Sequence, residues 1–380
     1  MSTSLRAAAE TLRTPSRGAP ASFLKHAGEV AQYFGFQHAR EFSPERSYTF
    51  AKVAGAASES RSAEPHLLYY ASGSPMHIPG DLRLGKQNDL AEFGLVIAGP
   101  EESLAEVILM RTLVTILTEW GLPAVRVRVN AMGDRDSKAR FGRELSGYLR
   151  KHFETLDEEC RNNATHDPAK VYHCRSEACR AIVASGPRAM NFLSEKSRLH
   201  FREVLEHIEE LNIPYELDDM LPGDDRESRI SFAIDTGGSP LIVGAAGGRF
   251  DDHMKKQSGK PLCAAHIYFR KGALNAAHFM PTKKSAPPRL FFIQLGVRAK
   301  IQGLTVVDMV RRAGIPMRQT FDARSLAPQI EAAKVAGTPH LIIMGAREAL
   351  DGTVIIRALD NSTQQIVALR DLPRTLKSLR

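Results

Sequence analysis

Residues 289–320, RLFFIQLGVRAKIQGLTVVDMVRRAGIPMRQT, carry the pattern that decides the fold of the C-terminal part of the chain. The apolar run at 290–295 predicts a buried strand, and the amphipathic stretch that follows predicts a helix at 301–313. Gly314 is a typical helix stop, and a second strand is expected at 316–320. This strand–helix–strand order is the beginning of an α/β unit.

The same unit repeats further along the chain. Ser325 is a predicted N-cap for a helix that continues to about residue 336, where Gly337 ends it. Three more strands are expected at 340–344, 353–358 and 365–369. The alternation of strands and helices, with a hairpin at the end, predicts a small α/β domain around a mixed sheet.

The positive charge of the protein is concentrated in this same region. The full chain has 51 Lys and Arg against 43 Asp and Glu, a net charge of +8, and residues 289–380 hold 14 of the basic and 7 of the acidic side chains. A basic domain gains free energy by neutralising a phosphate backbone, which favours nucleic acid as a partner, whereas the alternative is a domain with a high isoelectric point and no such role. The candidate RNA-binding residues are Arg298, Lys300, Arg318, Arg324 and Arg347.

Upstream, the chain divides into a linker and three pieces. The Pro- and Lys-rich segment 281–288 predicts an inter-domain linker. The pieces 18–129 and 215–280 carry β-type runs separated by turns, and we expect them to form one antiparallel sheet. The piece between them, 130–214, is rich in predicted helix and forms an insertion. Runs expected as strands are 215–217, 230–234, 241–243 and 265–269, and apolar stripes predict helices around 110–117 and 201–211.

Composition excludes several classes of protein. With 380 residues, of which 43% are hydrophobic and 25% charged, the chain can form two or three domains with cores, so intrinsic disorder and a disulfide-rich miniprotein are excluded. No window approaches 18 consecutive apolar residues, so no membrane span is expected. Residues 1–20 lack the apolar run of a signal peptide and resemble a transit peptide only weakly, which favours a frayed tail on a cytoplasmic protein.

The cysteines and the acidic pairs are the candidate metal ligands in the sequence. The chain has four cysteines and no C-x-x-C pair, which fits reduced thiols: Cys160, Cys174, Cys179 and Cys263. With His166 and His173, the first three offer ligands that zinc accepts, but their spacings match no standard zinc motif, so we expect buried thiols and no metal. The acidic pairs at 218–219 and 224–225 are interpreted as turn residues rather than Mg²⁺ ligands.

The most glycine-dense segment is 244–251, GAAGGRFD. It lacks the Gly-Lys-Ser/Thr of a Walker loop and the spacing of a dinucleotide-binding fingerprint. Its composition favours a glycine-rich hairpin. The alternative is a site where a ligand approaches the backbone and where Arg249 and Asp251 supply charge.

Several motifs, in chain order, resemble those of the histidyl-tRNA synthetases, which are class II aminoacyl-tRNA synthetases. They are VRVNAMG at 127–133, LDEEC at 156–160, DPAKV at 167–171 and FLSEKSRLHF at 192–201. The segment GGRFD at 247–251 is similar to the Gly-Gly-Arg-Tyr-Asp motif that lies beside bound histidine in that family. Short motifs in the C-terminal region resemble the family's anticodon-binding domain, so the resemblance covers most of the chain from about Gly18 onward.

One catalytic motif departs from the family's pattern while its register is kept. The family's Arg-Gly-Leu-Asp-Tyr-Tyr-Thr-Arg-Thr-Val-Phe motif aligns with PGDDRESRISF at 222–232, where Gly223, Asp225, Arg229 and Phe232 are retained. The alignment places Pro222 at the catalytic arginine, and Arg226 and Glu227 at the two tyrosines of the histidine site.

Three further motifs are altered. The Phe-Arg-x-Glu of motif 2 is missing before Glu92, and YASGSP at 70–75 stands in place of an Arg-Pro-Glu-Gly-Thr type segment. In motif 3, AAHIYFR at 264–270 puts bulky side chains where glycines make room for adenine, and Arg270 or Lys271 aligns with the arginine that binds ATP. Removing one group that stabilises the reacting phosphate typically costs about a hundredfold in rate, so the resemblance implies a scaffold without standard histidine activation.

The resemblance implies an α+β fold: a class II synthetase-like antiparallel sheet with helices, a helical insertion and a C-terminal α/β anticodon-binding-type domain, in a homodimer. The first hypothesis is a paralogue that binds tRNA or another structured RNA. The alternative is a working, divergent histidine–tRNA ligase, which would use ATP and Mg²⁺ and would need Arg83, Arg226 or Arg270 for phosphate contacts. A regulatory protein similar to the synthetase-derived subunit of ATP phosphoribosyltransferase comes last, because that subunit typically lacks the anticodon-type domain.

No catalytic residue is assigned. The candidate ligand-pocket residues are Gly223, Asp225, Arg226, Arg229, Gly247, Gly248, Arg249, Asp251 and Arg270.

Overall fold

The computed structural model describes residues 20–43, 45, 47–60, 65–73, 75, 89–122, 125–174, 176–221, 223, 226–236, 241–255, 260–270, 288–320, 325–359 and 364–379. The predicted N-terminal tail, residues 281–287 of the predicted linker, Arg83, Pro222, Asp225, Lys271 and Arg324 lie outside these residues. Within the described part of the chain, no helix is long and apolar enough to cross a membrane.

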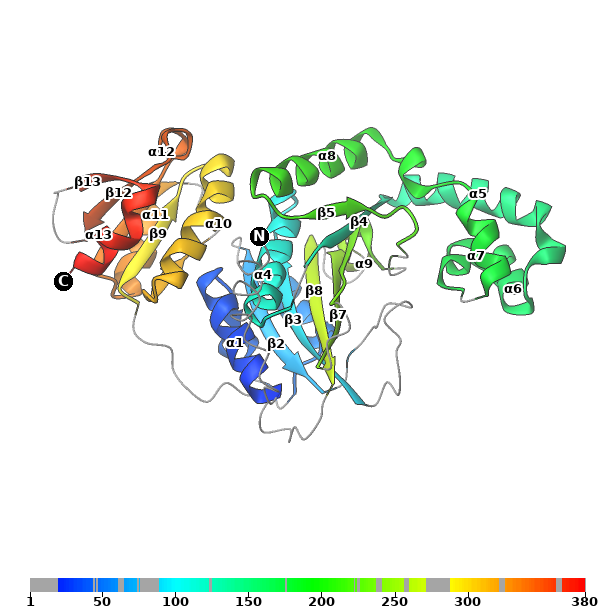
Figure 1. The fold of residues 1–380 in the computed structure, drawn as a ribbon, viewed down its shortest axis with the longest axis horizontal. Helices are drawn as coiled ribbons and strands as arrows, with labels where there is room; N and C mark the ends of the chain where they lie inside the picture. The colour runs from blue at the N-terminus through cyan, green and yellow to red at the C-terminus, as the bar shows by residue number, and fades with distance from the viewer. Residues whose placement is uncertain are drawn as a thin grey trace, which may run out of the picture.

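An eight-stranded sheet in the order β1-β2-β3-β8-β7-β6-β4-β5 forms the larger part of the molecule (Figure 1). Across the sheet, the six strands β2, β3, β8, β7, β6 and β4 pair antiparallel with one another. Among the described strands of this sheet, the edge strands β1 and β5 pair parallel with β2 and β4. Because β1–β4 precede the inserted helices and β5–β8 follow them, the predicted antiparallel sheet from two sequence-distant pieces is confirmed. The strands are β1 (Gln37–His38), β2 (His66–Ser72), β3 (Leu90–Ala98), β4 (Val127–Gly133), β5 (Tyr215–Leu217), β6 (Ser228–Ile234), β7 (Ile242–Arg249) and β8 (Leu262–Arg270).

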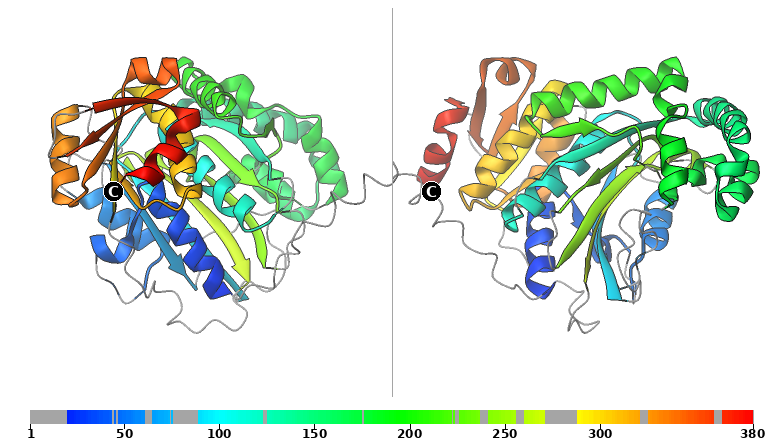
Figure 2. Two further views of the ribbon diagram at one scale, coloured as in Figure 1. Left: turned by 60° about the vertical axis from the view of Figure 1, so that its left-hand side comes forward. Right: turned by 45° about the vertical axis from the view of Figure 1, so that its right-hand side comes forward.

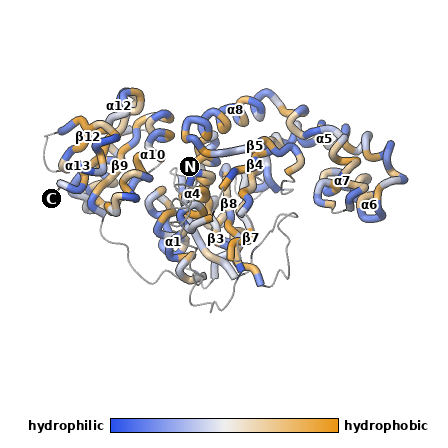
Figure 3. The backbone as a smooth tube through the Cα atoms, viewed as in Figure 1, coloured by the Kyte–Doolittle hydropathy of each residue, from blue (hydrophilic) through white to orange (hydrophobic). Residues whose placement is uncertain are grey.

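Helices cover the two faces of this sheet unequally. One face packs against α1 (Pro20–Tyr33), α4 (Leu104–Glu119) and α8 (Glu195–Glu210), and we call it the helix-covered face. The other, which we call the pocket face, packs in part against the shorter helices α2 (Ala39–Phe42), α3 (Phe50–Glu59) and α9 (Asp251–Lys255). Figure 2 shows α1 and α3 on opposite sides of the strands, and Figure 3 shows the apolar residues gathered in β3, β7 and β8.

The predicted helices at 110–117 and 201–211 are confirmed as α4 and α8. Their apolar stripes are buried against the sheet, because residues three and four apart lie on the same side of a helix. Ser194 caps α8, since its hydroxyl accepts a hydrogen bond from the backbone N–H of Ser197 at 3.2 Å. Both helices therefore present one apolar face to the strands, as the sequence indicates.

Between β4 and β5 the chain forms a group of helices, which we call the inserted helices, at one end of the molecule (Figure 1). They have a small hydrophobic core of their own, separate from that of the sheet. Residues 130–133 belong to β4, and Asp134, directly after it, caps α5 by accepting from the N–H of Ser137 at 2.9 Å. The elements are α5 (Arg135–Lys151), η3 (Phe153–Thr155), α6 (Glu158–His166), η4 (Pro168–His173), α7 (Glu177–Ala184) and η5 (Ala189–Phe192).

The C-terminal region forms a five-stranded mixed sheet in the order β10-β9-β11-β12-β13, with β10, β9 and β11 parallel and the last two strands antiparallel. The predicted small α/β domain with its terminal hairpin is confirmed. Helix α10 of this domain packs against α1 and α4, and Gln319 donates a hydrogen bond to the carbonyl of Tyr33 at 2.8 Å. The elements are β9 (Leu290–Gln294), α10 (Val297–Arg312), β10 (Met317–Gln319), α11 (Leu326–Val335), β11 (His340–Met344), α12 (Ala346–Asp351), β12 (Thr353–Ala358), β13 (Gln364–Ala368), η7 (Leu369–Asp371) and α13 (Leu372–Ser378).

Candidate functional site

A buried ionic network lies between the large sheet and its helices. Arg249, at the end of β7, is completely enclosed and donates to both carboxylate oxygens of Glu106 from α4, at 2.7 and 2.8 Å. Its remaining N–H groups reach the carbonyls of Pro100 and Glu102 and the carboxylate of Asp251. The side chain is thus fully used by the protein itself, and it joins β7 to α4.

Helix α8 is joined to the same network. His200 Nε2 lies 2.6 Å from Glu106 Oε1, the same oxygen that accepts from Arg249 Nε, and Arg229 reaches His200 at 3.5 Å and Asp251 at 3.8 Å. Burial alone raises the pKa of Glu106, but the charge and hydrogen bonds of Arg249, with those of His200, outweigh it and hold that pKa well below its usual range. Glu106 is therefore a buried anion whose charge is balanced by its neighbours.

Arg229 enters the network from a strained backbone. Its φ is +60°, in the left-handed region that residues other than glycine rarely adopt, and it lies where the pairing of β6 with β7 shifts register between Ser228 and Ser231. Such a bulge redirects a side chain, and here it turns Arg229 toward Asp251 and His200. Strain of this kind persists only where the surroundings hold it in place.

The predicted glycine-rich hairpin at 244–251 is wrong. Residues through Arg249 form β7, a strand in the interior of the large sheet, because its neighbours β6 and β8 pair along both edges. The glycines answer a packing requirement: a Cβ on Gly247 would lie 2.5 Å from the carbonyl oxygen of Ala264, and one on Gly248 would lie 2.6 Å from that of Ile230. Composition cannot show this, since the crowding comes from other strands.

A second polar cluster occupies the pocket face of the sheet. The hydroxyl of Tyr70 donates to Glu92 at 3.0 Å, and the Nδ1 atom of His266 lies 3.4 Å from that hydroxyl and 3.6 Å from the carboxylate. Burial, and then the charge of Glu92, raise the pKa of Tyr70 well above its usual value, so the phenol keeps its proton and acts as a donor. Tyr268 stacks on His266, with ring centroids 6.0 Å apart.

Glycine makes room for this cluster on β3. A Cβ on Gly94 would lie 2.3 Å from the ring of Tyr70, so the tyrosine lies flat over the backbone of the neighbouring strand. Tyr70, Glu92 and Tyr268 are all buried. His266 and Tyr268, the bulky side chains of the segment 264–270, therefore lie packed in this part of the face.

The remaining pocket candidates fall into two groups. Gly223 and Gly248 both lie close to the carboxylate of Glu227, because a Cβ on either would be about 3 Å from its oxygens. Arg226 is partly exposed in a turn beside them, whereas Arg270 is exposed at the far end of β8, opposite Leu90. The structure thus separates the eight candidates that it describes, and Arg249, Asp251 and Arg229 lie on the helix-covered side.

The RNA-binding candidates in the described part of the C-terminal domain are at or near its surface. Arg298 lies in the first turn of α10 and Arg347 in that of α12, and both helices begin where parallel strands, β9 and β11, end. Arg298 and Arg347 are exposed and Lys300 is half-buried. Arg318 is exposed on the edge strand β10.

Glu106, the centre of the ionic network, is not among the site residues predicted from the sequence. The signal available was a single carboxylate within the apolar run LAEVILM of α4, on a helix that is buried over most of its length. A charge in such a position is rarely buried without a partner. His200 belongs to one of the motifs quoted above, but nothing in its neighbourhood indicated that it contacts Glu106.

Comparison with known proteins connects this arrangement to a family. Residues 297–379 match the family described as the anticodon binding domain. The histidine–tRNA ligase of Nitratidesulfovibrio vulgaris is 27% identical over 308 residues, which cover 80% of this chain and 73% of the relative. That of Synechococcus elongatus is 26% identical over 382 residues, covering 97% of this chain and 87% of the relative.

Among solved structures, the apo histidyl-tRNA synthetase of S. aureus superposes with a TM-score of 0.43 at 18% identity, covering 87% of this chain and 80% of that one. The match to the Synechococcus elongatus relative spans nearly the whole chain, and so includes both halves of the large sheet, the inserted helices and the C-terminal domain. The chain thus carries a match to an anticodon binding domain in its C-terminal region and is similar to histidine–tRNA ligases over most of its length.

Proposed function

We propose that this protein binds tRNA or another structured RNA through its C-terminal domain and does not activate histidine with ATP. The observation that carries the proposal is the filled pocket face, where Tyr70, His266 and Tyr268 pack together around Glu92. Adenylate formation needs space for adenine and cationic groups at the reacting phosphate, and the alignment finds neither in its usual place.

The RNA-binding part of the proposal rests on the C-terminal domain. Its match to an anticodon binding domain and its excess of basic residues both favour an RNA partner. Arg298 and Arg347 lie on adjacent helices, α10 and α12, that contact each other. A phosphate backbone that crosses this end of the domain meets both side chains.

The competing function is a working histidine–tRNA ligase. It is favoured by the names of the relatives and by the intact network of Arg249, Glu106 and His200, which keeps the scaffold of the synthetase-like sheet in place. In that case Arg226 or Arg270 takes over phosphate contacts, and ATP and Mg²⁺ are bound. The proposal includes the expected division of the chain into a core of 18–129 and 215–280, an insertion of 130–214, a linker of 281–288 and a C-terminal domain of 289–380. It also includes a homodimer located in the cytoplasm.

The RNA-binding proposal is tested by measuring the affinity for total tRNA at several salt concentrations. We expect tight binding at low salt that weakens as salt rises, and a double variant, Arg298→Ala with Arg347→Ala, that lowers the affinity about tenfold and reduces the salt slope by about one for each lost phosphate contact. The matched control is Arg202→Ala, an exposed arginine on α8. The proposal is contradicted if the wild type does not bind tRNA at low salt. It is also contradicted if the affinity of the double variant equals that of the wild type while Arg202→Ala lowers it.

A further inference from the structure

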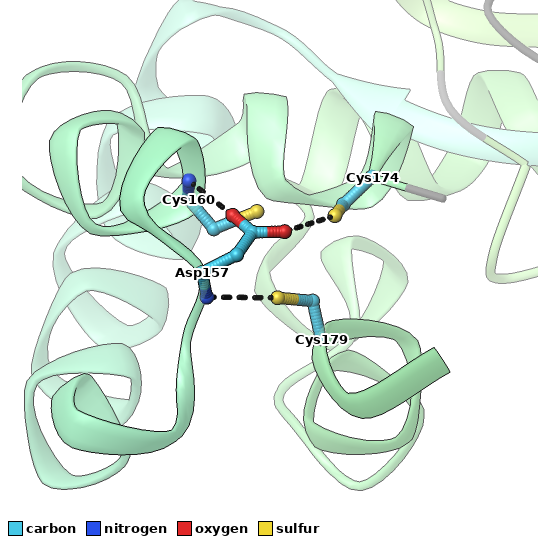
Figure 4. A group of neighbouring side chains, drawn as sticks. All are labelled: Asp157, Cys160, Cys174 and Cys179. Atoms are coloured by element: carbon cyan, nitrogen blue, oxygen red, sulfur yellow. Dashed lines mark hydrogen bonds between the residues drawn. The ribbon is translucent and has the colours of Figure 1, made fainter. Parts of the chain in front are cut away.

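A cluster of thiols in the inserted helices lies far from the features described so far. The Sγ atoms of Cys160, Cys174 and Cys179 and a carboxylate oxygen of Asp157 all lie within 4.8 Å of one another. Figure 4 shows the four side chains pointing toward a common centre. Neither His166 nor His173 joins the group in the described part of the chain, so the histidines considered with these cysteines are not its ligands.

The four residues are held at the ends of three short elements. Asp157 caps α6, where it accepts from the N–H of Cys160 at 2.8 Å, and Cys179 lies in the first turn of α7. Cys174 follows η4 directly. Helix N-termini favour negative charge, so the first turns of α6 and α7 are compatible with anionic metal ligands.

Hydrogen bonds hold the side chains of the cluster close together. The thiol of Cys174 donates to Asp157 Oδ2 at 3.2 Å, and the N–H of Asp157 donates to the sulfur of Cys179 at 3.4 Å. In a tetrahedral site with Zn–S bonds of about 2.3 Å, the donor atoms are about 3.8 Å apart. The four candidate ligand atoms lie within 4.8 Å of one another, so the longest separation exceeds this value by about 1 Å at most.

A structural reason for a metal also exists here. The inserted helices are short and share a small hydrophobic core centred on Leu145, Leu149 and Leu156. Small units bury too little apolar surface to be stable by packing alone and commonly depend on a metal or a cross-link. The thiols belong to this core: Cys160 and Cys179 are buried, and Cys174 is partly exposed.

We propose that Asp157, Cys160, Cys174 and Cys179 form a zinc site that joins α6, η4 and α7 and stabilises the inserted helices. Three thiolates and one carboxylate complete a closed tetrahedral site, which suits a structural rather than a catalytic ion. Binding displaces the thiol protons, so the hydrogen bond from Cys174 to Asp157 is replaced by bonds from both residues to the metal.

The first experiment measures the metal content of the full-length protein purified under reducing conditions without chelator. We expect about one zinc per chain in the wild type and in Cys263→Ala, which removes the one cysteine outside the cluster. Cys174→Ser should lower zinc retention at least tenfold when a chromogenic chelator competes for the metal. Zinc that is absent from the wild type even after incubation with a slight excess, or that stays bound in Cys174→Ser, overturns the proposal.

A second measurement needs no variant, so it remains decisive if Cys174→Ser does not fold. Co²⁺ added to metal-free wild-type protein should give the intense visible bands of tetrahedral cobalt and the near-ultraviolet band of thiolate ligation, and zinc should abolish both. Zinc should also protect three of the four cysteines from a thiol reagent. Weak bands typical of octahedral cobalt would contradict the zinc site. So would a disulfide, seen as two thiols that react only after treatment with a stronger reductant.

Discussion

The two faces of the large sheet carry two polar clusters of opposite character. On the helix-covered face, Arg249, Glu106 and His200 form a closed ionic network in which each charge has a partner, and it joins β7, α4 and α8. On the pocket face, Tyr70, Glu92 and His266 form a smaller cluster that joins β2, β3 and β8. The first cluster joins a strand to two helices, whereas the second joins side chains of three strands; under the proposed function, the second fills a former ligand site.

The difference shows how a scaffold can persist while its pocket changes. The residues of the ionic network are fixed by one another, since removing one leaves a buried charge without its partner. The pocket face has no such constraint, because bulky side chains can fill it at little cost to the rest of the sheet. We expect substitutions on the two faces to differ accordingly.

The largest effect is expected from Arg249→Leu. It leaves the Glu106 carboxylate buried without its main partner, and we expect the free energy of unfolding to fall by about 3–5 kcal/mol. Chemical denaturation measures the change, with Arg198→Ala as control, because that exposed pair with Glu195 is worth little. If Arg249→Leu and Arg198→Ala lower the free energy of unfolding by the same amount, the ionic network does not hold the fold together as described.

The dependence of stability on pH should reveal the contribution of Glu106 in the same network. The pKa of Glu106 is lower in the folded protein than its ordinary value of 4.5, so its contribution to stability is fully present above that value and is lost as the pH falls toward the folded pKa. Wild type should lose stability below about pH 4.5 more steeply than Glu106→Gln. Denaturation midpoints between pH 7 and pH 3 test this, and parallel profiles for the two proteins would argue against the network.

Gly94→Ala should have a moderate effect on the pocket face. The new methyl group meets the ring of Tyr70 at 2.3 Å, and we expect overpacking to cost about 1–3 kcal/mol. Gly55→Ala is the matched control, since its Cβ on α3 meets nothing within 4 Å and should stabilise that helix slightly. Equal effects at the two glycines would show that Tyr70 does not lie over β3 as described.

The smallest effect is expected from Tyr70→Phe. It removes the hydroxyl that donates to Glu92 and leaves the ring in place, so the free energy of unfolding should fall by only about 1 kcal/mol. The same denaturation experiment measures it. A loss as large as that of Arg249→Leu would mean that the pocket-face cluster is part of the framework, and the distinction between the faces would disappear.

Periodicity and capping residues predicted much of the fold. The stripes of α4 and α8, the cap at Ser194 and the order of strands in the C-terminal domain were all visible, because these signals are local. The strand β7 was missed, since its glycines are required by the carbonyls of Ala264 and Ile230 on neighbouring strands. Local composition carries no information about such contacts.

The candidate site was only partly predictable, for a related reason. The motif alignment singled out Arg249 and Asp251 as ligand-pocket candidates, and the structure shows the Arg249 side chain enclosed against Glu106, a partner that no motif indicated. The thiol cluster matched no known spacing because its donors come from the ends of separate elements, and Asp157 was named only as part of a family motif. Such groupings depend on how the chain folds back on itself.

The central claim is that the filled pocket face has ended histidine activation in a protein that still binds RNA. It is tested most directly by ATP–pyrophosphate exchange with the purified protein, with each amino acid in turn, in the presence and absence of total tRNA. We predict no exchange above background with histidine or any other amino acid. Histidine-dependent exchange would contradict the account and would show that other arginines serve the phosphate.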